Sequence, residues 1–81
     1  MTREELERAL DLADQGSWDE AHAIVQADEA DQTACWIHAM LHKIEGDAGN
    51  ARYWYRRAGR MGHVADEPTA ELIAIRESIR G

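Results

Sequence analysis

The chain has 81 residues, which suffices for one hydrophobic core and excludes a second independent domain. Fourteen residues are alanine, phenylalanine is absent, and six glycines and one proline interrupt the sequence. This composition favours helices packed against helices over a β-sandwich or barrel. The formal net charge of −7 argues against a general nucleic-acid binder and against docking on anionic membranes. We therefore expect a small all-α protein with neither nucleic acid nor membrane as a partner.

The cysteine content and the first residues indicate a compartment. Cys35 is the single cysteine, so the chain cannot form the intramolecular disulfides that stabilise small secreted domains. The first residues are polar and acidic, unlike a secretion signal, and no apolar run reaches the 18 residues of a membrane span. These features predict a cytoplasmic protein.

Residues 2–30 predict an antiparallel helical hairpin. Thr2 and Glu5 have the spacing of a capping box, in which a hydroxyl and a carboxylate satisfy free backbone N–H groups at a helix start. Apolar residues follow at helical spacing until a glycine ends the helix. A second capping box begins at Ser17 and predicts another helix, with Trp18 on its inner face.

A second hairpin is expected over residues 32–62. Asp31 or Thr33 can cap its first helix, whose inner stripe contains tryptophan, isoleucine, methionine and leucine. Two glycines then break the pattern. Asn50 is the expected N-cap of the second helix, and Gly62 is its expected stop.

The last helix is expected over residues 67–80. Pro68 fits its first turn, because the N–H group that proline lacks would be unpaired there. Leucine and isoleucine follow on one side of this helix. The sequence therefore predicts one domain, residues 1–81, with about five helices arranged as two hairpins and a C-terminal helix.

The two hairpins share a turn pattern with a period of 30 residues. Gly16 is followed five residues later by Ala21, and Gly46 is followed five residues later by Ala51. The first segment, Gly-Ser-Trp-Asp-Glu-Ala, resembles the turn of a tetratricopeptide repeat. The second unit is similar to a Sel1-like repeat, with its A-x-x-W-Y-x-x-A run and a terminal Gly-His pair.

The same region also resembles small bacterial proteins of unassigned function. The stretch that carries this resemblance is E-G-D-A-G-N-A-R-Y-W-Y-R-R-A-G, residues 45–59. Membership of the tetratricopeptide and Sel1-like group would imply stacked helical hairpins that bind other proteins.

One face of the helix expected before Gly46 carries groups that bind metals. His38 and His42 are four residues apart, the spacing at which two imidazoles on one helix can reach the same ion. Cys35 lies one turn before them and Glu45 one turn after, as further candidate ligands. The alternative is a pair of surface or interhelical histidines without a metal.

Folding the second hairpin about its glycine turn predicts a polar cluster. The turn sets Glu45 level with Asn50, His42 with Tyr53, and His38 with Arg57. Such a cluster could bind a small anion, because arginine offers a planar fork for carboxylate or phosphate. The alternative is a structural network that orients the two helices. We assign no role to the remaining histidines, which we expect at the surface.

The charges are unevenly distributed along the chain. Residues 1–31 contain ten acidic and two basic residues, whereas residues 43–60 contain five basic and two acidic ones. Arg52, Arg56 and Arg60 form one helical stripe, which we interpret as an interaction surface for acidic residues of the first hairpin or of a neighbouring copy. A solvated face is the alternative.

These features together predict a function class. The two repeat units, the small core and the divided charge indicate a non-catalytic module that binds a protein partner or itself, a homodimer being one such form. A small-anion or metal site is the alternative function. The sequence has no nucleophile elbow or phosphate-binding glycine loop, and we expect neither catalysis nor a cofactor.

Overall fold

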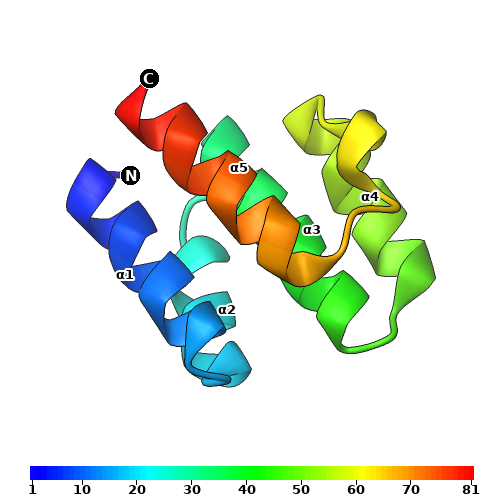
Figure 1. The fold of residues 1–81 in the computed structure, drawn as a ribbon, viewed down its shortest axis with the longest axis horizontal. Coiled ribbons are helices and arrows are strands. Elements are labelled where there is room, and N and C mark those ends of the chain that lie inside the picture. The colour runs from blue at the N-terminus through cyan, green and yellow to red at the C-terminus, as the bar shows by residue number, and fades with distance from the viewer.

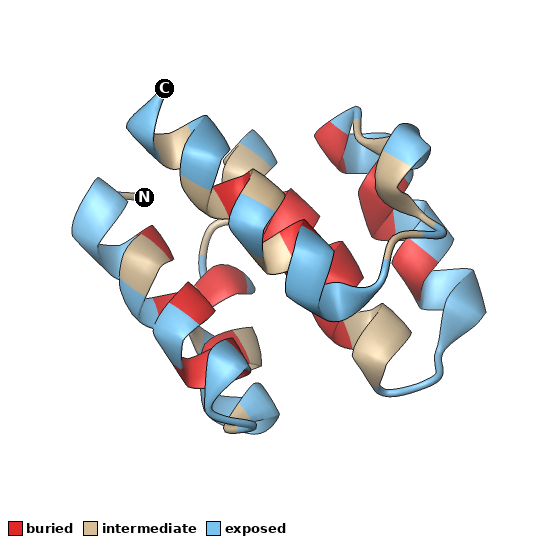
Figure 2. Ribbon diagram, viewed as in Figure 1, coloured by how far each residue is buried: buried red, intermediate tan, exposed pale blue.

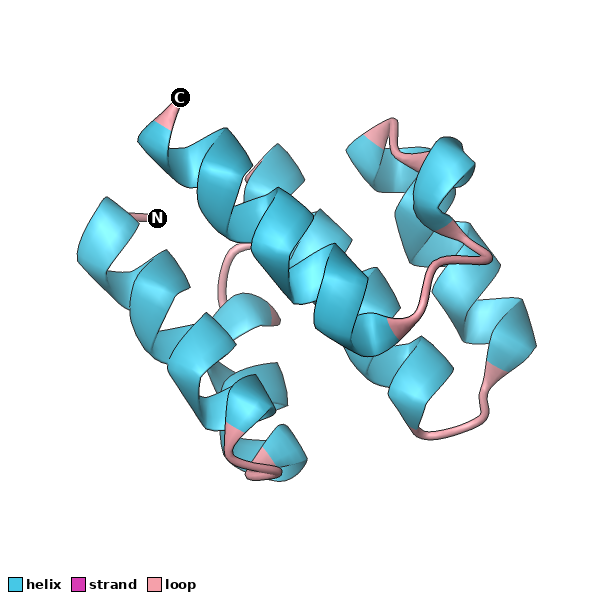
Figure 3. Ribbon diagram, in the orientation of Figure 1, coloured by secondary structure: helices cyan, strands magenta, loops and turns pink.

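The computed structural model describes all 81 residues as an all-α protein without strands, which confirms the expected fold class of about five helices (Figures 1 and 3). The elements in chain order are α1 (Arg3–Asp14), α2 (Trp18–Val25), α3 (Gln32–Ile44), α4 (Ala48–Ala58), the short 3₁₀ helix η1 (Met61–His63) and α5 (Pro68–Arg80). None of these helices combines the length and apolar character needed to cross a bilayer.

Helix α3 is the centre of the arrangement. It contacts each of the other four α-helices. Helix α5 lies against α3 and beside α1, so that the first and last helices of the chain also touch (Figure 1). Helix α4 lies on the far side of α3 from α1 in this view.

The burial of α3 differs from the one-sided pattern expected from the sequence. Eight consecutive residues, from Ala34 to Leu41, are buried (Figure 2). Cys35 and His38, which we expected on a separate metal-binding face of this helix, are therefore buried as well. The reason is that neighbours cover both sides of α3, whereas a helical wheel assumes that one face meets solvent.

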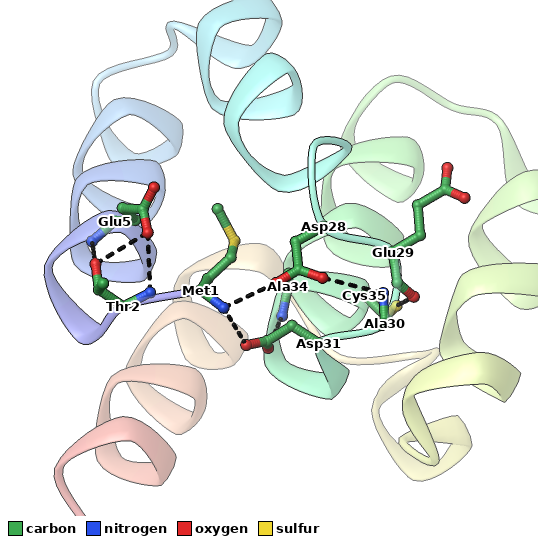
Figure 4. Close-up of polar contacts among 9 residues, drawn as sticks. All are labelled: Met1, Thr2, Glu5, Asp28, Glu29, Ala30, Asp31, Ala34 and Cys35. Atoms are coloured by element: carbon green, nitrogen blue, oxygen red, sulfur yellow. Dashed lines mark hydrogen bonds and ion pairs between the residues drawn. The ribbon is translucent and has the colours of Figure 1, made fainter.

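The starts of the first three helices follow the sequence only in part. Thr2 and Glu5 form the predicted capping box of α1, and Asp31 caps α3 by accepting a hydrogen bond from the Ala34 N–H (Figure 4). Ser17, however, makes no side-chain capping bond to α2. Trp18 is 40% exposed instead of buried, because it is the first residue of α2 and the helix packs through residues further along it.

The boundaries of α4 also differ from expectation. Asp47, not Asn50, is the N-cap, and its carboxylate accepts a hydrogen bond from the Asn50 N–H. The helix ends at Gly59, not Gly62, with a φ of 68° at Gly59. Glycine adopts this left-handed conformation at little cost, which makes the earlier glycine the stop.

A buried carboxylate connects α5 to the α3 and α4 pair. Glu71 is fully buried, and its Oε2 accepts hydrogen bonds from Trp36 Nε1 at 3.0 Å and from the Tyr55 hydroxyl at 2.5 Å. Its Oε1 has no well-directed hydrogen bond and instead forms an ion pair with Lys43 Nζ at 2.7 Å. Burial, followed by the hydrogen bond to Glu71, raises the pKa of Tyr55. These contacts fix the position of α5.

Lys43 also holds the connection between α4 and α5. Its Nζ donates hydrogen bonds to the carbonyl oxygens of His63 at 3.1 Å and Asp66 at 2.6 Å. One ammonium group therefore joins the C-terminal part of α3, the end of η1, the loop after it and, through Glu71, the first turn of α5.

Candidate metal site

Three histidines meet where α2 packs against α3. His22 comes from α2, and His38 and His42 come from α3. One ring nitrogen of each lies within 4.8 Å of those of the other two. The closest pair is His22 Nε2 and His38 Nε2, at 2.7 Å, a distance at which one imidazole donates an N–H and the other accepts it.

Helix geometry and packing place these rings. His38 and His42 lie four residues apart on one face of α3, and their rings stack with centroids 5.0 Å apart. His22 points edge-on at both, with centroids at 4.4 and 4.9 Å. The indole of Trp54 on α4 stacks on the other side of His38 at 4.0 Å. The ring of His38 is thereby held between two neighbours.

The protein environment disfavours protonation of the two α3 imidazoles. Burial, helped by the positive charges that His22 and His42 would carry, lowers the pKa of His38 to about 4. Burial and the neighbouring His22 also lower the pKa of His42. His38 is therefore neutral at pH 7, the form of histidine that binds metals.

Two carboxylates from the turn between α3 and α4 border the cluster. Glu45, the C-cap of α3, has Oε1 3.9 Å from His22 Nδ1. Asp47, the N-cap of α4, has Oδ2 3.8 Å from His42 Nδ1. That nitrogen is buried and has no hydrogen-bond partner, which is unusual for a buried polar atom.

The spacing of the nitrogens can be compared with that in a zinc site. Zn²⁺ binds histidine nitrogens at about 2.0–2.1 Å, so that a tetrahedral ion holds its ligand atoms about 3.3 Å apart. The separations here, from 2.7 Å for the closest pair to at most 4.8 Å, include this value. Small ring rotations would bring all three nitrogens onto one ion, and the fourth position would be open to water.

Cys35, the third metal ligand considered from the sequence, lies outside the cluster. Its thiol donates a hydrogen bond to the Glu29 carbonyl at 3.2 Å, in the loop between α2 and α3 (Figure 4). Burial raises the pKa of this thiol. The carboxylates of Asp28 and Asp31, which belong to the same loop, contact the N-terminal ammonium group of Met1 at 2.8 and 3.1 Å.

The structure divides the six residues of the expected anion cluster among separate places. Asn50 bonds to the Asp47 carboxylate at the start of α4. Arg57 donates to the Tyr53 hydroxyl at 3.3 Å and to the Glu29 carbonyl at 3.0 Å, on an exposed part of the surface. No hydrogen bond links either pair to His38, His42 or Glu45.

His22 is the member of the histidine cluster that the sequence did not predict. We expected it at the surface, whereas it is half-buried against the two α3 histidines. It lies 16 residues before His38, with a turn between them, so no local spacing rule connects the two. The available signal was the expected packing of the two hairpins, which brings α2 close to α3.

The arginine stripe also divides in the structure. Arg52 and Arg56 are exposed, and neither forms a hydrogen bond or ion pair through its side chain. Arg60 is half-buried, with its guanidinium 4.8 Å from the centre of the Trp36 ring. The free part of the stripe is therefore the outer face of α4.

Comparisons with protein-family models, with curated proteins and with solved structures find no match to this chain. The resemblance to tetratricopeptide and Sel1-like repeats stays a prediction from the sequence.

Proposed function

We propose that this protein binds a divalent first-row transition metal ion, with Zn²⁺ as the reference ion, through His22, His38 and His42. The observation that carries the proposal is the approach of three imidazole nitrogens to within 4.8 Å of one another from two packed helices. Imidazole suits Zn²⁺, Cu²⁺ and Ni²⁺, whereas Mg²⁺ and Ca²⁺ prefer oxygen ligands.

The groups around the histidines support this assignment. Metal-binding histidines commonly donate their second ring N–H to a carboxylate, which fixes the ring. Glu45 lies near the Nδ1 of His22, and Asp47 lies near the Nδ1 of His42. Both distances are slightly too long for a hydrogen bond, and the ring rotations that bring the ligands together can shorten them. The stacked Trp54 already restrains His38.

The role that follows is structural and non-catalytic. The ion would link α2 of the first helix pair to α3 of the second. A ligand that binds only the folded chain stabilises it, by about 2.7 kcal/mol at a free concentration 100 times the dissociation constant. The proposal includes the cytoplasmic location predicted from the sequence, where Cys35 stays a thiol.

The experiment uses untagged protein, since a histidine tag would itself bind the ion. Native mass spectrometry and calorimetry with Zn²⁺ should show one ion per chain, and Co²⁺ should give the visible absorption of a tetrahedral site. His22→Gln and His42→Gln should each lose binding by about tenfold or more. His63→Gln is the matched control, because His63 bonds to Asp66 outside the cluster.

Two results would contradict the proposal. One is wild-type protein that takes up no Zn²⁺ when the free Zn²⁺ concentration is about 100 times a micromolar dissociation constant. The other is a His22→Gln variant that binds Zn²⁺ as tightly as the His63→Gln control does. Circular dichroism of each variant establishes that the helices are retained.

A further inference from the structure

The outer face of α4 is basic and aromatic. Arg52, Tyr53 and Arg56 are exposed on it, with Tyr53 at 47%. No acidic residue lies in α4, and neither Arg52 nor Arg56 has an ion-pair partner elsewhere in the chain. Arginine and tyrosine are enriched at protein interfaces and among the residues that dominate binding energy. We call these three residues the α4 face.

The turn between α1 and α2 has the opposite character. Asp14 at the end of α1, and Asp19 and Glu20 at the start of α2, are exposed beside this turn, none of them in an ion pair, near the 40% exposed indole of Trp18. We call these four residues the acidic turn. It lies at the closed end of the first hairpin, and α4 lies on the opposite side of the molecule from that hairpin (Figure 1). One chain therefore cannot bring its own two charged regions together.

We infer that the α4 face of one copy binds the acidic turn of a second copy. The opposite charges and the exposed aromatic on each side make the two surfaces complementary. Because the surfaces differ and lie on opposite sides, the contact is head-to-tail, and each added copy presents a free surface to the next. A nucleic acid is the poorer occupant of the α4 face, since the whole chain carries −7.

The contact is expected to be weak, because exposed charge pairs contribute little free energy each. Charge complementarity mainly sets the partner and the association rate. We expect a dissociation constant between about 10 μM and 1 mM. Association should weaken in high salt, because the Debye length falls to about 3 Å at 1 M.

The test is a pair of charge reversals, studied by light scattering and analytical ultracentrifugation with chelator present, so that no metal ion bridges copies. Arg52→Glu with Arg56→Glu makes both surfaces acidic, and Asp19→Lys with Glu20→Lys makes both surfaces basic. Each double variant alone should lose association by about tenfold or more. An equimolar mixture should regain it, since each variant now complements the other.

Net charge does not explain that outcome. The lysine pair adds four units to a chain of −7, so both variants remain negative and repel one another at long range. Arg3→Glu with Arg80→Glu is the control, because it makes the same change in net charge as the α4 variant at exposed sites away from the α4 face. This control should associate like the wild type.

Three outcomes would overturn the inference. They are a wild type that stays monomeric up to about 1 mM, a mixture of the two reversed variants that stays monomeric, and a control that loses association as fully as the α4 variant does. Binding of the α4 face to a short DNA or RNA duplex, lost in the Arg52→Glu and Arg56→Glu variant, combined with a monomeric wild type, would assign the surface to nucleic acid instead.

Discussion

Replacing Glu71 with alanine tests the buried contact that fixes α5. The substitution removes the acceptor for Trp36 Nε1 at 3.0 Å and for the Tyr55 hydroxyl at 2.5 Å. It also removes the ion-pair partner of Lys43 at 2.7 Å. All of these donors would then face a small apolar side chain.

The magnitude follows from the hydrogen bonds and the ion pair that the Glu71 carboxylate makes. A hydrogen bond to a charged group contributes about 1.5–3 kcal/mol, and the alanine variant lacks two of them. Removing one partner of a buried ion pair costs about 3–5 kcal/mol, a figure that overlaps with the first because the same carboxylate is involved. We expect Glu71→Ala to lower the free energy of unfolding by about 4 kcal/mol. At about 0.05–0.15 kcal/mol per residue the whole domain has about 4–12 kcal/mol, so the alanine variant keeps about 0–8 kcal/mol and unfolds at the lower end of that range.

Glu71→Gln provides a second measure of the stabilisation by the Glu71 carboxylate if the alanine variant does not fold. Glutamine retains the shape and one oxygen acceptor but loses the charge opposite Lys43, so a loss of about 2 kcal/mol is expected. Urea unfolding followed by circular dichroism gives both values. Glu77→Ala is the matched control on α5, since Glu77 is exposed, and it should change stability by less than about 0.5 kcal/mol. A value for Glu71→Ala within about 1 kcal/mol of that control would refute the reasoning.

Three further predictions concern caps, turns and pH. Thr2→Ala should cost about 1 kcal/mol in urea unfolding because it removes the capping box, whereas Ser17→Ala should be neutral because Ser17 makes no capping bond; equal effects would contradict this. Gly46→Ala should lower the melting temperature, since Gly46 has a φ of 83°, whereas Gly49→Ala in the first turn of α4 should leave it unchanged or raise it. His38 has a pKa of about 4 when folded against an ordinary 6.5, so the unfolded chain binds more protons between these values. Its contribution is complete above pH 6.5 and is lost as the pH falls toward 4, by up to about 3 kcal/mol. Urea unfolding with chelator at about pH 7.5 and about pH 4.5 should show this loss, and His38→Gln should show clearly less of it.

The helices could be predicted because their signals are local. Apolar spacing, the Thr2 capping box and the glycine breaks depend on residues within a few positions of one another. The errors lie where two residues of similar character compete. Asp47 and Asn50 can both cap a helix, and Gly59 and Gly62 can both end one; only the backbone conformation decides between them.

Only the α3 part of the candidate site could be predicted from the sequence. The four-residue spacing of His38 and His42 is visible in the sequence, but the third imidazole depends on how α2 packs against α3. Cys35 is close in sequence and turns toward the Glu29 carbonyl. The hydrogen bonds of the buried Glu71 carboxylate were not predicted for the same reason, since its partners lie 16 to 35 residues away in the sequence.

The shortness of α2 affects how a metal affinity should be interpreted. Helix α2 has eight residues and no side-chain capping bond, whereas the two proposed ligands on α3 lie in the helix that all the other α-helices contact. If His22 leaves when α2 detaches, the apparent dissociation constant equals the intrinsic one divided by the fraction of chains with α2 in place. A titration with Zn²⁺ would then measure the docking equilibrium of a single helix, and substitutions in α2 far from the ion would change the affinity in proportion to that fraction.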